Sequence, residues 1–139
     1  MRESPHPDPL PPGEGEDRLV EAATRYRGNA VSKRSGFSVG AAIEDETGRI
    51  WGGCNVENST YGLTVCAERV AIWKALSEGV RKFRAVAVVT GAQEPTPPCG
   101  ACRQILWEFA GDVPIVMATS EGRKKRFTLR ELFPEPFDF

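Results

Sequence analysis

Histidine, net charge and long apolar runs are the features that this sequence has least of. Its one histidine, His6, lies in a proline-rich segment, so a metal site built on histidines is excluded. The 18 basic and 19 acidic residues give a net charge of −1, which leaves no basic excess for nucleic acid or an anionic membrane. No apolar run is long enough to cross a membrane, and the first residues lack the apolar core of a signal peptide. We therefore expect a cytoplasmic domain with no nucleic-acid or membrane partner.

Cysteine is also scarce, but three of the four cysteines have a spacing that fits a metal ion. Cys99 and Cys102 form a Cys-x-x-Cys pair after two prolines, and Cys66 lies earlier in the chain. In the cytoplasm thiols stay reduced, and such a pair favours metal binding or catalysis over a disulfide. All three lie at predicted helix N-termini, where the helix dipole favours the thiolate. Three protein ligands leave one tetrahedral position of a zinc ion open for water, which is typical of a catalytic zinc site.

Two residues next to Cys66 extend this interpretation. Glu68 can take a proton from a metal-bound water and pass it on, which is general acid–base chemistry. In isolation it would be a surface glutamate in the first turn of a helix, but the Pro-Cys-x-x-Cys motif downstream favours the acid–base role. Arg69 is a candidate to offset the negative charge of three thiolates, with a solvated position on the helix as the alternative.

Three other interpretations of the cysteines stay open. Cys99 and Cys102 could be a thioredoxin-like redox pair, which would leave Cys66 and Glu68 without a role. A structural zinc site would need a fourth ligand, and Cys54 is the one cysteine left to supply it. The thiols could also be buried and inert. We expect Cys54 itself to be a buried, small apolar residue.

The hydrophobic pattern predicts one α/β domain after a short extension. Residues 1–16, which are rich in proline, are expected to be disordered, and the domain spans residues 17–139 with Asp17 capping its first helix. The expected elements are a helix from 17 to about 32, a hairpin of strands at 37–43 and 50–54, a helix at 66–78, a strand at 85–89, a helix at 100–109, a strand at 113–118, a basic turn at 122–125 and a short helix from 128. Strands and helices in this order predict a three-layer α/β domain with a mixed sheet.

From about residue 37 to residue 137 the sequence resembles the cytidine deaminases, in the short form with three cysteine ligands. Phe37-Ser38-Val39-Gly40-Ala41-Ala42 is similar to the Phe-x-Val-Gly-Ala-Ala strand of that family, and residues 53–58 with Tyr61-Gly62 are similar to its ribose-binding loop. Cys66-Ala67-Glu68-Arg69 and Pro98-Cys99-Gly100-Ala101-Cys102-Arg103-Gln104 match its metal and catalytic motifs. Each motif is weak by itself, but together and in this order they are specific.

The resemblance implies a three-layer α/β/α sandwich with a mixed sheet of about five strands. It also implies hydrolytic deamination of cytidine and deoxycytidine to uridine and deoxyuridine, with release of ammonia, as in pyrimidine salvage. One zinc ion per chain would be held by Cys66, Cys99 and Cys102. Zinc-activated hydroxide would attack C4 of the cytosine ring, with Glu68 as the proton shuttle.

The same resemblance assigns residues to substrate binding. Asn55 and Glu57 would hydrogen-bond the ribose, although loop residues of these types can instead satisfy backbone groups. The backbone N–H of Ala67 would contact the base carbonyl, and Phe37 would stack near the base unless it is a core residue. Phe137 would reach into the site of a neighbouring subunit, which implies a homotetramer.

Two segments depart from the pattern of the family. Residues 31–36 read Val-Ser-Lys-Arg-Ser-Gly where a Pro-Tyr-Ser-like segment is usual, and Pro97 replaces a common serine or threonine. The pair Lys33-Arg34 near the pocket entrance keeps blasticidin-type aminonucleoside deaminases as an alternative, although Asn55-x-Glu57 favours an ordinary ribose. An alternative of another class is a non-catalytic, zinc-stabilised binding module.

Overall fold

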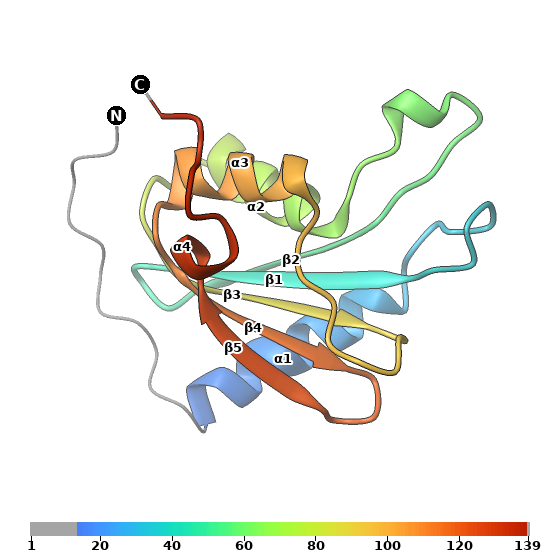
Figure 1. The fold of residues 1–139 in the computed structure, drawn as a ribbon, viewed down its shortest axis with the longest axis horizontal. Coiled ribbons are helices and arrows are strands. Elements are labelled where there is room, and N and C mark those ends of the chain that lie inside the picture. The colour runs from blue at the N-terminus through green and yellow to red at the C-terminus, as the bar shows by residue number, and fades with distance from the viewer. Residues whose placement is uncertain (1–13, 139) are drawn as a thin grey trace.

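A five-stranded mixed sheet forms the middle layer of the domain (Figure 1). The computed structural model describes residues 14–138. Its strands lie in the order β2-β1-β3-β4-β5, and only β3 and β4 run parallel to each other. The strands are β1 (Val39–Asp45), β2 (Ile50–Cys54), β3 (Phe83–Thr90), β4 (Pro114–Thr119) and β5 (Lys124–Thr128). The predicted hairpin is present as the antiparallel pair β1–β2.

Helices cover both faces of the sheet, so the predicted three-layer α/β/α sandwich is confirmed. The helices are α1 (Glu14–Arg27), α2 (Ala67–Ser77), α3 (Gly100–Ala110) and α4 (Leu129–Leu132), with a short 3₁₀ helix, η1 (Tyr61–Leu63). Alternate residues of each strand face opposite layers, because side chains alternate across a pleated strand. In β1, for example, Ala41 packs in the apolar cluster under α2 and α3, and Ala42 packs in the cluster under α1. Within the described residues, no helix is both long and apolar enough to cross a membrane.

The N-terminal boundary of the fold differs from the prediction. Helix α1 begins at Glu14, so Asp17 is not its N-cap, and residues 14–16 belong to the folded domain. Arg126 of β5 donates to both carboxylate oxygens of Glu16, at 2.5 and 2.6 Å, and Lys124 donates to Asp17 at 2.9 Å. Contacts between residues so far apart in the sequence give no local sequence pattern from which the start of the helix could be predicted. The helix ends at Arg27, before Gly28, and not near residue 32. The disorder expected for residues 1–13 lies outside the described residues.

The pattern of apolar residues also failed to predict one strand, β5. The residues expected as a basic turn lead directly into β5, which pairs antiparallel with β4 from Pro114↔Thr128 to Ala118↔Lys124. Its charged side chains look like a loop in the sequence, but they are the residues that protect the exposed edge of a sheet from pairing with another chain. The predicted capping box is present, with Thr128 and Glu131 each accepting a hydrogen bond from the other's backbone.

Candidate functional site

Three thiols meet where helices α2 and α3 begin. Cys66 and Cys99 are the N-cap residues of α2 and α3, and Cys102 lies in the first turn of α3. Their sulfur atoms all lie within 4.8 Å of one another, and the Sγ atoms of Cys66 and Cys99 are 3.8 Å apart. Two thiolates bound tetrahedrally at about 2.3 Å from a zinc ion would be about 3.8 Å apart. The donor set and its spacing therefore fit zinc.

Positive charge and hydrogen bonds favour a thiolate in this cluster. The guanidinium of Arg69 donates from Nη2 to the Cys66 sulfur at 3.2 Å. A hydrogen bond from the Cys102 thiol, together with Arg69, lowers the pKa of Cys66 to about 5. The pKa of Cys102 is raised, because its thiol donates to Cys66 and is buried. Arg69 thus lies where the sequence analysis placed a charge-compensating residue, and not in solvent.

Glu68 lies beside the thiols with its carboxyl group buried. It occupies the first turn of α2 and is 5% exposed. Burial, reinforced by the negative charge of Cys66, raises the pKa of Glu68 to about 7. A carboxyl group with this pKa can both accept and release a proton near neutral pH, as general acid–base catalysis requires.

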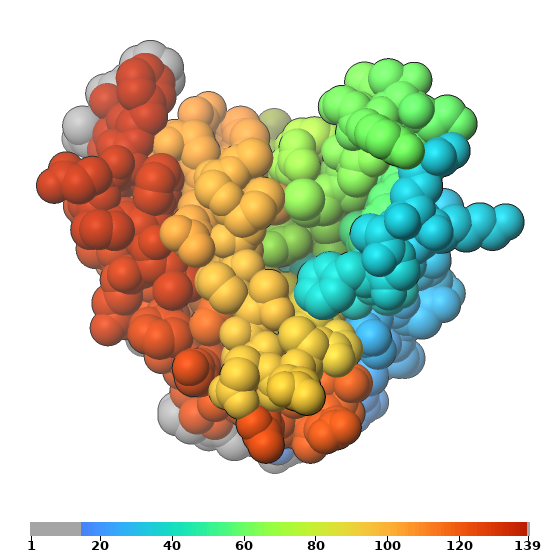
Figure 2. Space-filling model, turned by 45° about the vertical axis from the view of Figure 1, so that its right-hand side comes forward, coloured from blue at the N-terminus to red at the C-terminus, as the bar shows by residue number. Residues whose placement is uncertain are grey.

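Two of the three thiols, Cys66 and Cys99, line a cavity of about 280 Å³ together with Glu68. Ser35, Phe37, Asn55 and Glu57 line the same cavity. The remaining lining residues are Val39, Thr64, Ala67, Val88, Thr90, Thr96 and Pro97. Figure 2 shows the face on which the segment before β1, in cyan, lies beside the loop before α3, in yellow. A volume of this size is close to the lower end of the range for small-molecule sites.

Asn55 fixes the backbone of residues 37–39 beside this cavity. It is 8% exposed; its Nδ2 donates to the Phe37 carbonyl at 2.8 Å, and its Oδ1 accepts from the Val39 N–H at 2.9 Å. The alternative role for Asn55, satisfying backbone groups, is therefore realised in this structure. Each end of the amide keeps one further hydrogen-bonding position, because an amide has two donors and two acceptor lone pairs.

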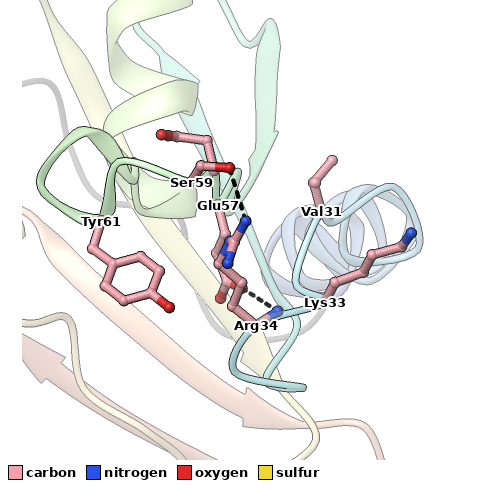
Figure 3. A pocket seen from close by; sticks show the side chains of 7 residues that line it. Val31, Lys33, Arg34, Glu57, Ser59 and Tyr61 are labelled. Carbon is pink, nitrogen blue, oxygen red and sulfur yellow. Dashed lines mark hydrogen bonds between the residues drawn. The ribbon is translucent and has the colours of Figure 1, made fainter.

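Glu57 forms the wall between this cavity and a second, open pocket of about 640 Å³ (Figure 3). Its Oε1 accepts from the backbone N–H groups of Arg34 and Ser35, at 3.0 and 3.1 Å, and its Oε2 accepts from the Ser35 hydroxyl. These bonds, the Ser35 hydroxyl first, hold the pKa of Glu57 below its usual value. Glu57 is therefore an ionised hydrogen-bond acceptor.

The two phenylalanines assigned to substrate binding are placed differently. Phe37 is 40% exposed and lines the cavity, so it is not a core residue. Phe137 is 64% exposed and does not line the cavity of its own chain. Its backbone is fastened to α3 by the side chain of Gln104, which donates to the Phe137 carbonyl at 2.8 Å and accepts from its N–H at 3.1 Å. Cys54 is half-buried at the end of β2 and is not among the clustered thiols.

Four hydroxyl-bearing residues of the cavity, Ser35, Thr64, Thr90 and Thr96, were missed by sequence reasoning. Ser35 contacts Glu57 directly, and the hydroxyls of Thr90 and Thr96 lie 3.1 Å apart in the cavity wall. Ser35 belongs to the segment that departs from the family pattern, and Thr90 ends a strand. Neither position carries a motif of its own.

Comparison with known proteins decides the family. Residues 14–119 match the family model described as "Cytidine and deoxycytidylate deaminase zinc-binding region". This chain belongs to that deaminase family. The cytidine deaminase of Sporosarcina psychrophila is 43% identical over 122 residues, which are 87% of this chain and 90% of that protein. The cytidine deaminase of Halalkalibacterium halodurans is 42% identical over 120 residues, which are 86% and 91% of the two chains.

Solved structures support the same membership. The 1.6 Å crystal structure of cytidine deaminase from Burkholderia pseudomallei superposes with a TM-score of 0.85 at 40% sequence identity. The match covers 87% of this chain and 98% of that one. The mixed five-stranded sheet and its two helical layers are thus the fold of a deaminase of this family.

Proposed function

We propose that this protein is a zinc-dependent hydrolase that converts cytidine and deoxycytidine to uridine and deoxyuridine with release of ammonia. The observation that carries the proposal is a cavity lined by two kinds of group. Two thiols of the three-cysteine cluster and a buried carboxyl line it, together with an amide and an ionised carboxylate suited to hydroxyls. This distribution matches a nucleoside, which has an amine-bearing ring and a polyhydroxylated sugar.

Cys66, Cys99 and Cys102 would hold one zinc ion per chain, with Arg69 offsetting part of the negative charge of the thiolates. When bound, zinc supplies a Lewis acid that acidifies water for addition to the ring carbon bearing the amine. The 3.8 Å separation of two of the sulfur atoms supports this ligand set.

Glu68 would carry the protons of the reaction. Its carboxylate would take a proton from the attacking water and deliver it to N3 of the ring. It would then take the proton of the hydroxyl group added to the ring carbon and pass it to the amine, which leaves as ammonia while the ring carbonyl forms. Its position at the cavity wall and its pKa of about 7 support this role. The N–H of Ala67, at the start of α2, would contact the base carbonyl, since the first N–H groups of a helix have no partner within it.

Asn55 and Glu57 would bind the sugar, and Phe37 would pack against the base. Each residue lines the cavity. Asn55 would bind the sugar through the amide donor and acceptor positions that its hydrogen bonds to Phe37 and Val39 leave free. Glu57 would accept a hydrogen bond from a sugar hydroxyl.

The exposed apolar surface supports association of several chains, for which we propose a homotetramer. Tyr61, Leu63 and Phe137 are 71%, 67% and 64% exposed, which leaves three large apolar side chains for a neighbouring chain to cover. In that assembly Phe137 would complete the site of a neighbouring subunit. A cytoplasmic enzyme of pyrimidine salvage is the corresponding physiological role.

The test is the ultraviolet absorbance change when zinc-loaded protein is incubated separately with cytidine, deoxycytidine, a cytidine nucleotide and blasticidin S. We expect turnover of both nucleosides. Turnover of blasticidin S alone would favour the aminonucleoside alternative that the pair Lys33-Arg34 keeps open. No turnover of any of the four compounds would favour a zinc-stabilised binding module and contradict the proposal.

A further inference from the structure

The turn before β1 holds Glu57 from one side only. Residues 34 and 35 supply all three hydrogen bonds that the Glu57 carboxylate receives from the described part of the chain: two from backbone N–H groups and one from the Ser35 hydroxyl. A carboxylate has about four acceptor positions, two on each oxygen. Both positions of Oε1 and one position of Oε2 are therefore filled, and one position on Oε2 is left.

The Ser35 hydroxyl also connects Glu57 to the residue that would pack against the base. While it donates to Glu57 Oε2, it accepts from the Phe37 N–H at 3.0 Å. The Phe37 carbonyl is in turn bonded to Asn55 at 2.8 Å. The Ser35 hydroxyl thus sets the relative positions of the Glu57 side chain and Phe37, which both line the cavity.

Arg34 fastens this turn to the loop that carries Glu57. Its guanidinium donates to the Ser59 hydroxyl at 2.9 Å and lies 5.4 Å from the centre of the Tyr61 ring (Figure 3). The turn and the loop are thereby joined at Glu57 and again at Ser59 and Tyr61. Arg34 therefore helps to hold the turn against the loop that carries Glu57.

We propose that Ser35 is a positioning residue that aims the last acceptor position of Glu57 at the sugar of the substrate. The proposal rests on the function proposed above, and it adds that the contact between Glu57 and the sugar depends on the Ser35 hydroxyl. Analogues without a sugar hydroxyl facing Glu57 would leave the carboxylate unpaired, and a phosphate ester there would bring two negative charges together.

The test compares cytidine with 2′,3′-dideoxycytidine in four proteins: the parent, Ser35→Ala, Ser35→Thr and Ser32→Ala. Ser32→Ala is the matched control, because the Ser32 hydroxyl bonds to Ser38 at 2.7 Å and does not contact Glu57.

Loss of an interaction made equally in the ground state and the transition state raises KM and leaves kcat unchanged. For Ser35→Ala we expect KM for cytidine to rise about tenfold, the size of one charge-assisted hydrogen bond. The KM for the dideoxynucleoside should change less than about twofold, so the preference for cytidine shrinks. Ser35→Thr, which keeps the hydroxyl, should restore the preference, and Ser32→Ala should leave it unchanged.

A binding measurement separates failure of this proposal from failure of the proposed function. Glu68→Gln removes the proton-transfer group, so calorimetric titration with the two nucleosides can be done in that background without turnover. The same loss of preference in Ser35→Ala supports the positioning role even if the parent protein does not deaminate cytidine. Equal weakening of both nucleosides by Ser35→Ala, or a fall in kcat with KM unchanged, would overturn it.

Discussion

Replacing Gly53 by alanine should displace the start of helix α2 and thereby lower activity, because α2 packs directly on the backbone of β2. A Cβ atom at Gly53 would lie 2.6 Å from the Ala67 carbonyl oxygen and 2.6 Å from the Ala71 nitrogen, both backbone atoms of α2. Ordinary contact begins at 3.4 Å, so the start of the helix must move by about 0.8 Å. Ala67 stands between Cys66 and Glu68, and a shift of about 1 Å at reacting groups costs about 10²-fold in rate. We expect kcat/KM of Gly53→Ala to fall by about that factor, with a loss of about 1–3 kcal/mol in stability from overpacking.

The neighbouring glycine provides the control. A Cβ atom at Gly52 would strike the ring of Tyr26 on α1, which lies on the opposite face of the sheet. Gly52→Ala should therefore lower the free energy of unfolding by a similar amount, while the folded fraction keeps kcat/KM within about threefold of the parent. The assays are urea unfolding followed by circular dichroism, and initial rates of cytidine deamination corrected for the folded fraction. If the two variants lose activity equally, or if Gly53→Ala keeps the parent rate, the close approach of β2 to α2 does not position the site.

Three further changes test other parts of the structure. Cys102→Ser should reduce the zinc content from about one ion per chain to near zero, measured by atomic absorption on protein purified without added chelator; full occupancy would remove Cys102 from the ligand set. In Asp45, burial alone would raise the pKa, but hydrogen bonds from the Thr47 hydroxyl and the Trp51 indole outweigh it and lower the pKa. The stability that comes from a lowered carboxyl pKa is present above the unfolded pKa near 4 and is lost as pH falls through the folded pKa. Asp45→Asn should thus cost about 1–2 kcal/mol at pH 7 and flatten the acid limb of a stability–pH curve, and an unchanged acid limb would contradict this. Phe137→Ala should leave the free energy of unfolding within about 0.5 kcal/mol but lower the activity of the assembled protein, whereas unchanged activity would exclude a role in a neighbouring site.

Most of the fold could be predicted because its elements carry local signals. The buried strands appear as apolar runs, and helix α2 ends where predicted, next to Gly79 with its positive φ of 93°. Strand β5 could not be recognised in this way, because an edge strand that begins with three consecutive basic residues has no apolar run. The start of α1 was misplaced for a different reason. Its first turn is held by Arg126, 110 residues away.

The cysteine cluster was more predictable than the contacts around Glu57. Cys66 and Glu68 lie two residues apart on one helix, and Cys99 and Cys102 lie on one turn of another, so spacing alone brought each pair together. Ser35 is different. Its importance depends on the turn that brings its hydroxyl to Glu57, which is 22 residues further along the chain.

The central claim is that Glu68 moves protons beside a metal held by three cysteines. The most direct test is the rate of ammonia release from cytidine by parent protein and by Glu68→Gln, each with its zinc content measured in the same sample. The account predicts about one zinc ion per chain in both proteins, and a rate that falls about 10²- to 10⁴-fold in the variant, the usual contribution of general acid–base catalysis. A zinc-loaded Glu68→Gln protein that deaminates cytidine at the parent rate would contradict it.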